Sequence, residues 1–220
     1  MEKPPGRTLE EARDIREHAA KTGARVMVSM NRRFDPAIVS ADKGRSGRPL
    51  HHIRAVQWRN NRREADFLCS TGIHVVDAMR YLAGEVRNFQ SNVRRVEGVL
   101  WYQVQLEFTC GAMGSLEVLP SCGCVAERYE LAGPDYHIRT GTGEADRGVT
   151  ETWEDGKRVQ VDEPAKGMPL HVRNGSYAET CAFIECLKNG QKPWPSVNDV
   201  WPSVDLCHRI HQLALSQLVD

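Results

Sequence analysis

The stretch LWYQVQLEFT, residues 100–109, decides the fold of this chain. Every second residue in it is large and apolar, and the residues between are mostly polar. A period of two places successive side chains on opposite faces of a strand, so one face is buried and the other is exposed. This alternation is typical of an antiparallel sheet, because strands of parallel sheets are apolar on both faces. The apolar positions are Leu100, Tyr102, Val104, Leu106 and Phe108.

Further elements on both sides of this strand complete the same architecture. Short apolar segments predict a strand at 52–58, and others at about 115–119, 127–132 and 136–140, with a hairpin turn at 153–157. Helical spacing predicts helices at 67–83, 176–188 and 199–217, the last with Pro202 in its first turn. The sequence therefore predicts an α+β fold, an open and mainly antiparallel sheet with helices on one face.

The first 34 residues follow a different pattern. Thr8 and Glu11 form a capping box that starts a helix, Gly23 ends it, and residues 25–30 have the composition of a buried strand. Helix, turn and buried strand follow one another in α/β units, yet no strand precedes Lys3. We therefore expect residues 1–34 to be the carboxyl-terminal remnant of a Rossmann-type dinucleotide-binding domain and residues 35–220 to be an α+β substrate and dimerisation domain.

Charge and composition exclude several classes of function. The chain has 29 Lys and Arg residues against 29 Asp and Glu, so no basic excess points to nucleic acid or an anionic membrane. No apolar run approaches the roughly 18 residues of a membrane span, and the first residues are charged, so we expect a cytoplasmic protein. The seven cysteines include no C-x-x-C pair, and we expect neither a disulfide framework nor a metal site.

One helix face offers titratable groups for chemistry. Ser70, His74, Asp77 and Tyr81 are spaced so that they share one stripe of the helix predicted at 67–83. A histidine held by a carboxylate can exchange a proton near neutral pH, which makes His74 a candidate acid or base. The alternative is an ordinary solvated face, or a ring that only caps a loop.

Three basic residues are further candidates. Lys3 precedes two prolines that stiffen the backbone, so its amine has a fixed direction, although a surface lysine is the simple alternative. Arg32 and Arg33 follow the predicted buried strand and could clamp an anionic or polyhydroxylated substrate with their planar guanidinium groups. They could equally pair with carboxylates between elements.

Four short motifs in register give the chain a family resemblance. EKP at residues 2–4, NRRFDP at 31–36, GIHVVD at 72–77 and LAG at 82–84 resemble the Gfo/Idh/MocA oxidoreductases in order and spacing. Members are two-domain NAD(P)-dependent enzymes that act on sugars, inositols and similar compounds. Their amino-terminal domain is a Rossmann fold, and the antiparallel carboxyl-terminal domain lines the substrate site and often forms the dimer. The resemblance implies the carboxyl-terminal portion of such an enzyme, with NAD or NADP as its cofactor.

The resemblance also implies roles for individual residues. Lys3, with Pro4 beside it, would lie next to the cofactor and substrate, and Lys3 would orient and polarise the reacting group. His74 would move the proton, and Asp77 matches the acidic residue that follows the histidine in the family. We also expect Arg33, Ser70 and Asp77 to contact the substrate. Ser70 stands where many members have an aspartate four residues before the histidine, so the usual Asp–His pair is broken.

The sequence contains no Gly-x-Gly-x-x-Gly, the turn that binds the pyrophosphate of a dinucleotide. We therefore expect the chain to lack most of the Rossmann domain and to be inactive in isolation. A competing hypothesis is a non-catalytic dimerisation or binding module with the same fold. In both cases the outward face at Trp101, Gln103 and Gln105 predicts a homodimer or a higher homo-oligomer formed through the sheet. The predicted partners are a small-molecule substrate and copies of the chain itself, with no nucleic acid and no membrane.

Overall fold

The computed structural model describes residues 1–142, 146 and 148–218. Its centre is an eight-stranded sheet in the order β2-β3-β4-β1-β5-β6-β7-β8. Neighbouring strands run antiparallel except β1 and β4, which are parallel. The α+β fold with an open, mainly antiparallel sheet is thus confirmed. The strands are β1 (His52–Trp58), β2 (Val86–Val96), β3 (Val99–Phe108), β4 (Met113–Leu119), β5 (Ala126–Ala132), β6 (Tyr136–Gly141), β7 (Thr150–Glu154) and β8 (Lys157–Asp162).

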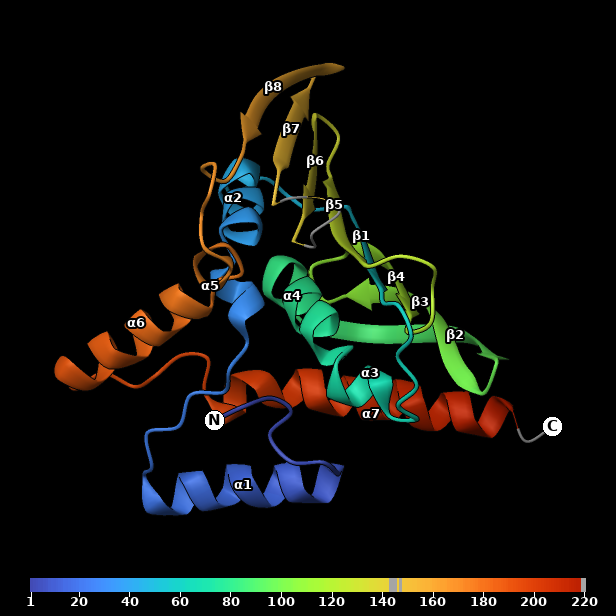
Figure 1. Ribbon diagram of the computed structural model, residues 1–220, viewed down its shortest axis with the longest axis vertical. Coiled ribbons are helices and arrows are strands. Elements are labelled where there is room, and N and C mark those ends of the chain that lie inside the picture. Colours follow the sequence, from blue (N-terminus) through green and yellow to red (C-terminus); the bar gives the residue numbers. More distant parts are fainter. Residues whose placement is uncertain (143–145, 147, 219–220) are drawn as a thin grey trace.

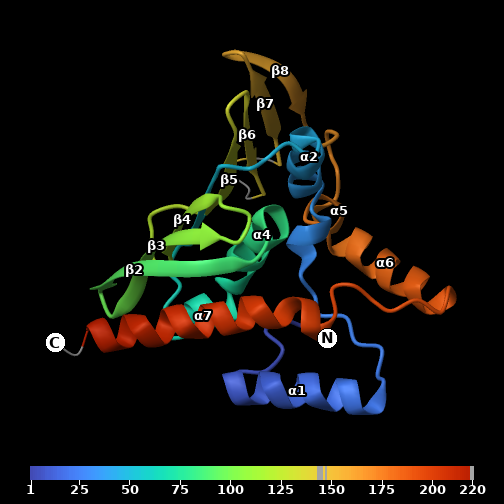
Figure 2. The same cartoon turned by 180° about the vertical axis from the view of Figure 1, so that it is seen from behind.

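The helices gather on one face of this sheet and leave the other open (Figure 1). Helix α2 packs on β6 and β7, α4 on β1, and α7 on β2, while α1 forms an outer layer on α7 (Figures 1 and 2). The helices are α1 (Leu9–Thr22), α2 (Pro36–Arg45), α3 (Phe67–Ser70), α4 (Ile73–Ala83), α5 (Leu170–Arg173), α6 (Ser176–Lys188) and α7 (Val197–Gln217), with a 3-10 turn η1 (Asn31–Phe34). No helix within the described residues is long and apolar enough to cross a membrane.

The alternation in β3 forms the core as predicted. Its apolar positions are all buried, and Gln103, Gln105 and Glu107 between them are exposed. Tyr102 reaches through the core so that its hydroxyl lies 2.8 Å from Nδ1 of His211 in α7. The capping box at Thr8 and the left-handed cap at Gly23 are also confirmed for α1.

The structure differs from the sequence predictions in four places. The helix predicted at 67–83 is two helices, because the backbone N–H groups of Thr71 and Gly72 both turn back to the carbonyl of Phe67, each at 2.8 Å. Residues 25–30 lie in no strand, since their backbone bonds reach only isolated neighbours such as the carbonyl of Met1. Pro202 is the sixth residue of α7 and not in its first turn. Strand β2 was not predicted, because VRNFQSNVRRV is polar on both faces and only Val93 in it is buried.

Candidate functional site

The α3–α4 junction brings the two predicted catalytic side chains together. The amine of Lys3 donates a 2.7 Å hydrogen bond to the backbone carbonyl of Ser70, in the last turn of α3. His74 stands in the first turn of α4, and the positive charge of Lys3 contributes to lowering its pKa. The amine of Lys3 is therefore held at the α3–α4 junction, close enough for its charge to act on His74.

His74 is partly buried and electrostatically unusual. Its Nδ1 is buried and has no partner among the described residues, which leaves Nε2 as the nitrogen that can reach a ligand. Burial lowers the pKa of the ring to about 3, with further lowering by the charges of Arg32, Lys3 and Arg59, while Glu127 opposes them. The ring is therefore neutral at physiological pH.

A carboxylate that the sequence analysis did not single out lies at the centre of the site. Glu127 in β5 accepts two hydrogen bonds from Arg32, at 2.5 and 3.0 Å, a further bond from Arg59, and one at 3.0 Å from the hydroxyl of Tyr129. Burial opposes its ionisation, but the charges and hydrogen bonds of the two arginines outweigh this and hold the pKa of Glu127 well below its ordinary value. Glu127 is therefore an anion in the protein interior.

Gln57 in β1 links this cluster to the junction. Its Nε2 is 3.4 Å from Glu127 and 3.4 Å from the carbonyl of Thr71, and its Oε1 is buried without a partner in the described chain. The helix-facing positions of β1 and β5 are apolar elsewhere, with Ile53 and Leu131 fully buried. Glu127 and Gln57 each interrupt an otherwise apolar face of a strand. That interruption is the feature of the sequence from which this part of the site could have been predicted.

The pKa of Lys3 is lower than that of an ordinary lysine. Burial lowers the pKa of its amine; the nearby carboxylate of Glu2 raises it, and the charges of Arg62, Arg32 and Arg59 lower it further. The net direction is downward. A lysine in this state remains a hydrogen-bond donor and gives up a proton more readily than a free surface lysine.

Ser70 does not orient the imidazole. Its hydroxyl donates to the carbonyl of Asp66 at 3.2 Å, within its own short helix. The serine acts on the site through its backbone carbonyl, which holds Lys3. Ser70 and His74 do not share the predicted helical stripe, because α3 ends at Ser70 and α4 begins at Ile73. A contact of Ser70 with substrate remains a prediction.

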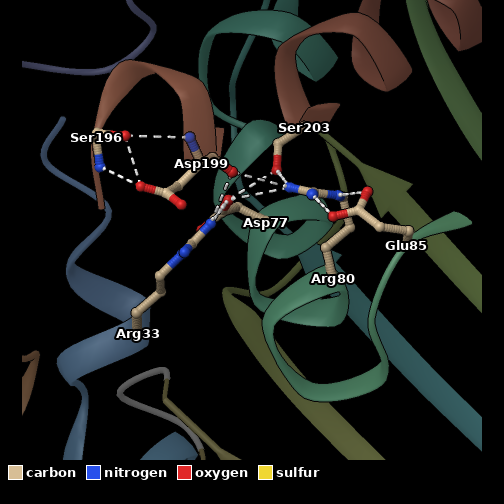
Figure 3. A network of polar contacts seen from close by, with 7 residues as sticks. All are labelled: Arg33, Asp77, Arg80, Glu85, Ser196, Asp199 and Ser203. Carbon is tan, nitrogen blue, oxygen red and sulfur yellow. Dashed lines mark hydrogen bonds and ion pairs between the residues drawn. The ribbon is translucent and has the colours of Figure 1, made fainter. Parts of the chain in front are cut away.

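Arg33 and Asp77 lie in a buried network instead of on a polar face (Figure 3). The guanidinium of Arg33 binds both carboxylate oxygens of Asp77 at 2.8 Å, and Ser203 of α7 donates to the same carboxylate at 2.7 Å. Asp77 is 0% exposed and Arg33 is 7% exposed. We therefore interpret this pair as a structural link of η1 to α4 and α7; a contact of Arg33 or Asp77 with substrate remains a prediction.

The first comparison with known proteins concerns sequence. No protein-family model matches the chain. Over 227 aligned residues the chain is 26% identical to scyllo-inositol 2-dehydrogenase (NAD(+)) of Bacillus subtilis, strain 168. The match covers 94% of the chain and 64% of that relative, so the chain spans less than two thirds of its length.

Solved structures share the whole architecture described above. A Gfo/Idh/MocA family oxidoreductase from Vibrio cholerae superposes with a TM-score of 0.83 at 16% identity, over 100% of this chain and 71% of that one. The chain has the Gfo/Idh/MocA fold. Levoglucosan dehydrogenase in complex with NADH and L-sorbose has the same fold, with a TM-score of 0.82 at 19% identity over 98% of this chain and 70% of that one. The resemblance predicted from the four motifs is confirmed, and the chain corresponds to the carboxyl-terminal part of these relatives.

The solved levoglucosan dehydrogenase structure holds NADH. In the chain described above, the α3–α4 junction is partly open to a ligand. Lys3 and Pro4 are half-exposed and Nε2 of His74 is the reachable ring nitrogen, so polar groups able to meet a reacting ligand are present. The motif Gly-x-Gly-x-x-Gly does not occur in the sequence.

Proposed function

We propose that this chain forms the substrate-side portion of an NAD(P)-dependent oxidoreductase that acts on a sugar, an inositol or a similar hydroxylated small molecule. The observation that carries the proposal is the meeting of Lys3 and His74 at the α3–α4 junction. The names of the relatives support the substrate class, since one is an inositol dehydrogenase and another is a levoglucosan dehydrogenase.

The site residues have separate tasks in this proposal. Bound NAD(P)⁺ supplies the hydride acceptor. The amine of Lys3, fixed by the carbonyl of Ser70, donates to the reacting oxygen and holds it in position. Nε2 of His74 exchanges the proton with that oxygen. Glu127 fixes Arg32 and Arg59 by hydrogen bonds, and the charges of all three residues act on the ring of His74.

A chimeric enzyme tests this assignment. The chain is joined behind the amino-terminal part of the Bacillus subtilis relative, and reduction of NAD⁺ or NADP⁺ is followed with a panel of polyols and sugars. General acid–base catalysis contributes about 10²–10⁴-fold, so His74→Ala should lower kcat by at least about 100-fold. His18→Ala, an exposed histidine of α1, is the matched control. Equal turnover of the two variants would show that His74 does not carry the proton.

We further propose that the open face of the sheet pairs with a second copy of the chain to form a homodimer. Its outward positions along β3 are polar, and the neighbouring strand β4 adds an exposed apolar residue, Met113, which is 64% exposed. Sedimentation equilibrium tests this proposal: Gln103→Lys with Gln105→Lys should convert a dimer to a monomer through like-charge repulsion across the two-fold axis. A wild-type monomer at about 100 μM would rule the dimer out, since stable interfaces bind below that concentration.

A further inference from the structure

The site around His74 carries more positive than negative charge. Three cations act on the ring, from Lys3, Arg32 and Arg59, and one carboxylate, Glu127, opposes them. Arg62 lies near Lys3 but has its own partner in Glu64.

The excess charge lies where water screens it poorly. The side chains of Arg32 and Arg59 are 16% and 14% exposed, and that of Glu127 is 1% exposed. Asp35 is a second buried carboxylate that acts on Arg32, but burial raises its pKa to about 7, so it is only partly ionised at neutral pH. Glu127 and a partly ionised Asp35 do not neutralise two guanidinium groups and an ammonium. Glu2 also acts on Lys3, but its side chain is exposed, so solvent weakens its effect. Like charges held together in a partly desolvated site cost free energy that a bound anion recovers.

Donor groups remain free at the same place. Arg32 uses Nε and Nη2 for Glu127, which leaves Nη1 without an acceptor among the described residues. The ammonium of Lys3 has three N–H groups and one acceptor in the described chain, the carbonyl of Ser70. The site thus offers charged donors in excess of its acceptors, and an anionic oxygen is the group that matches both the charge and the donors.

We propose that the substrate of this site bears an anionic group, as a polyol carrying a carboxylate or a phosphate, and that Lys3 and Arg32 recognise that group beside His74. This inference rests on the proposed function for the polyol part of the ligand and goes beyond it in the charge. The bound anion also offsets the cations that act on His74, so that the ring can hold a proton closer to neutral pH.

The test is a comparison of ligands by isothermal titration calorimetry on the complete 220-residue chain. Gluconate and glucose 6-phosphate are the anionic probes, and glucose and myo-inositol are the neutral ones. One charge-assisted hydrogen bond corresponds to about a tenfold change in affinity, so an anionic probe should bind at least about tenfold more tightly than a neutral one at low salt. The two anions separate carboxylate from phosphate recognition. Higher salt should reduce the difference.

Matched variants assign the effect to the site. Lys3→Met should remove most of the preference for the anion, Lys3→Arg should restore it, and Lys21→Met, an exposed lysine of α1, should leave it unchanged. In NMR titrations the pKa of His74 should rise when the anionic probe is bound. The proposal would be overturned if neutral probes bound as tightly as anions, or if neither anion bound in the millimolar range. It would also be overturned if Lys3→Met and Lys21→Met lost the preference for the anion equally. These readouts need no turnover, so they separate a failure of the charge assignment from a failure of the oxidoreductase assignment.

Discussion

The link of η1 to α4 can be tested by removing one charge from it. Asp77→Asn keeps the shape of the side chain but leaves the guanidinium of Arg33 buried without its anion (Figure 3). Removing one partner of a buried ion pair costs about 3–5 kcal/mol, because the remaining charge stays desolvated. Asparagine retains one oxygen for Arg33 and for Ser203, so we expect a loss near the lower end, about 3 kcal/mol.

The matched control is Asp205→Asn. Asp205 is paired with Arg209 at 3.4 Å on the exposed side of α7, and their side chains are 35% and 53% exposed. An exposed pair of this kind contributes about 0–0.5 kcal/mol, because water screens both charges.

Urea unfolding measures both variants. With an m value of about 3 kcal/mol per M for a chain of this size, Asp77→Asn should lower the midpoint by about 1 M and Asp205→Asn by less than about 0.2 M. The m values should stay unchanged if only stability is affected. A loss below about 1 kcal/mol for Asp77→Asn would mean that the buried pair does not stabilise this packing and that our structural interpretation of it is wrong.

Three further predictions concern buried groups and one close contact. Burial raises the pKa of Asp35 from 3.8 to about 7, so the folded state loses stability as the pH rises between these values. The urea midpoint of Asp35→Asn should therefore be higher than that of the wild type at pH 8, and the two midpoints should approach each other near pH 4. The pKa of His74 is lowered from 6.5 to about 3, so its contribution to stability is present above pH 6.5 and is lost as the pH falls toward 3. The urea midpoint of His74→Gln should therefore fall less steeply than that of the wild type from pH 6 to pH 4.5. Equal slopes for the two proteins would contradict this. A Cβ at Gly72 would lie 2.7 Å from the carbonyl oxygen of Leu68, so Gly72→Ala should cost about 1–3 kcal/mol in urea unfolding, whereas Gly123→Ala, with open space around it, should cost little.

The elements predicted correctly are those whose pattern is local. The alternation of residues 100–109 reports a buried and an exposed face directly, and Thr8 with Glu11 reports a capping box within four residues. Strand β2 lacks such a pattern, because it is an edge strand whose side chains are mostly exposed. Its position is set by pairing with β3 and by packing of α7, which are long-range contacts.

The same division applies to the site. Lys3 and His74 could be named from motifs, and the structure places them together, although their roles remain predictions. Glu127 could not be assigned to Arg32 from sequence, because 95 residues separate them and any of the chain's acidic residues could have been its partner. The sequence left two roles open for Arg32, a clamp on substrate or an ion pair between elements. The structure shows an ion pair, because Arg32 of η1 binds Glu127 of β5.

Two consecutive arginines explain how such distant elements are held in register at the site. Successive residues of a 3-10 turn point about 120° apart, so Arg32 and Arg33 diverge from η1 in different directions. Arg32 binds Glu127 of the sheet with two hydrogen bonds, and Arg33 binds Asp77 of α4 with two. Each bidentate pair fixes both distance and orientation, so η1 joins the sheet to the helix that carries His74. A change in Arg33 should therefore alter the surroundings of His74 without touching the ring, whereas a change in Arg32 should alter the charge beside it.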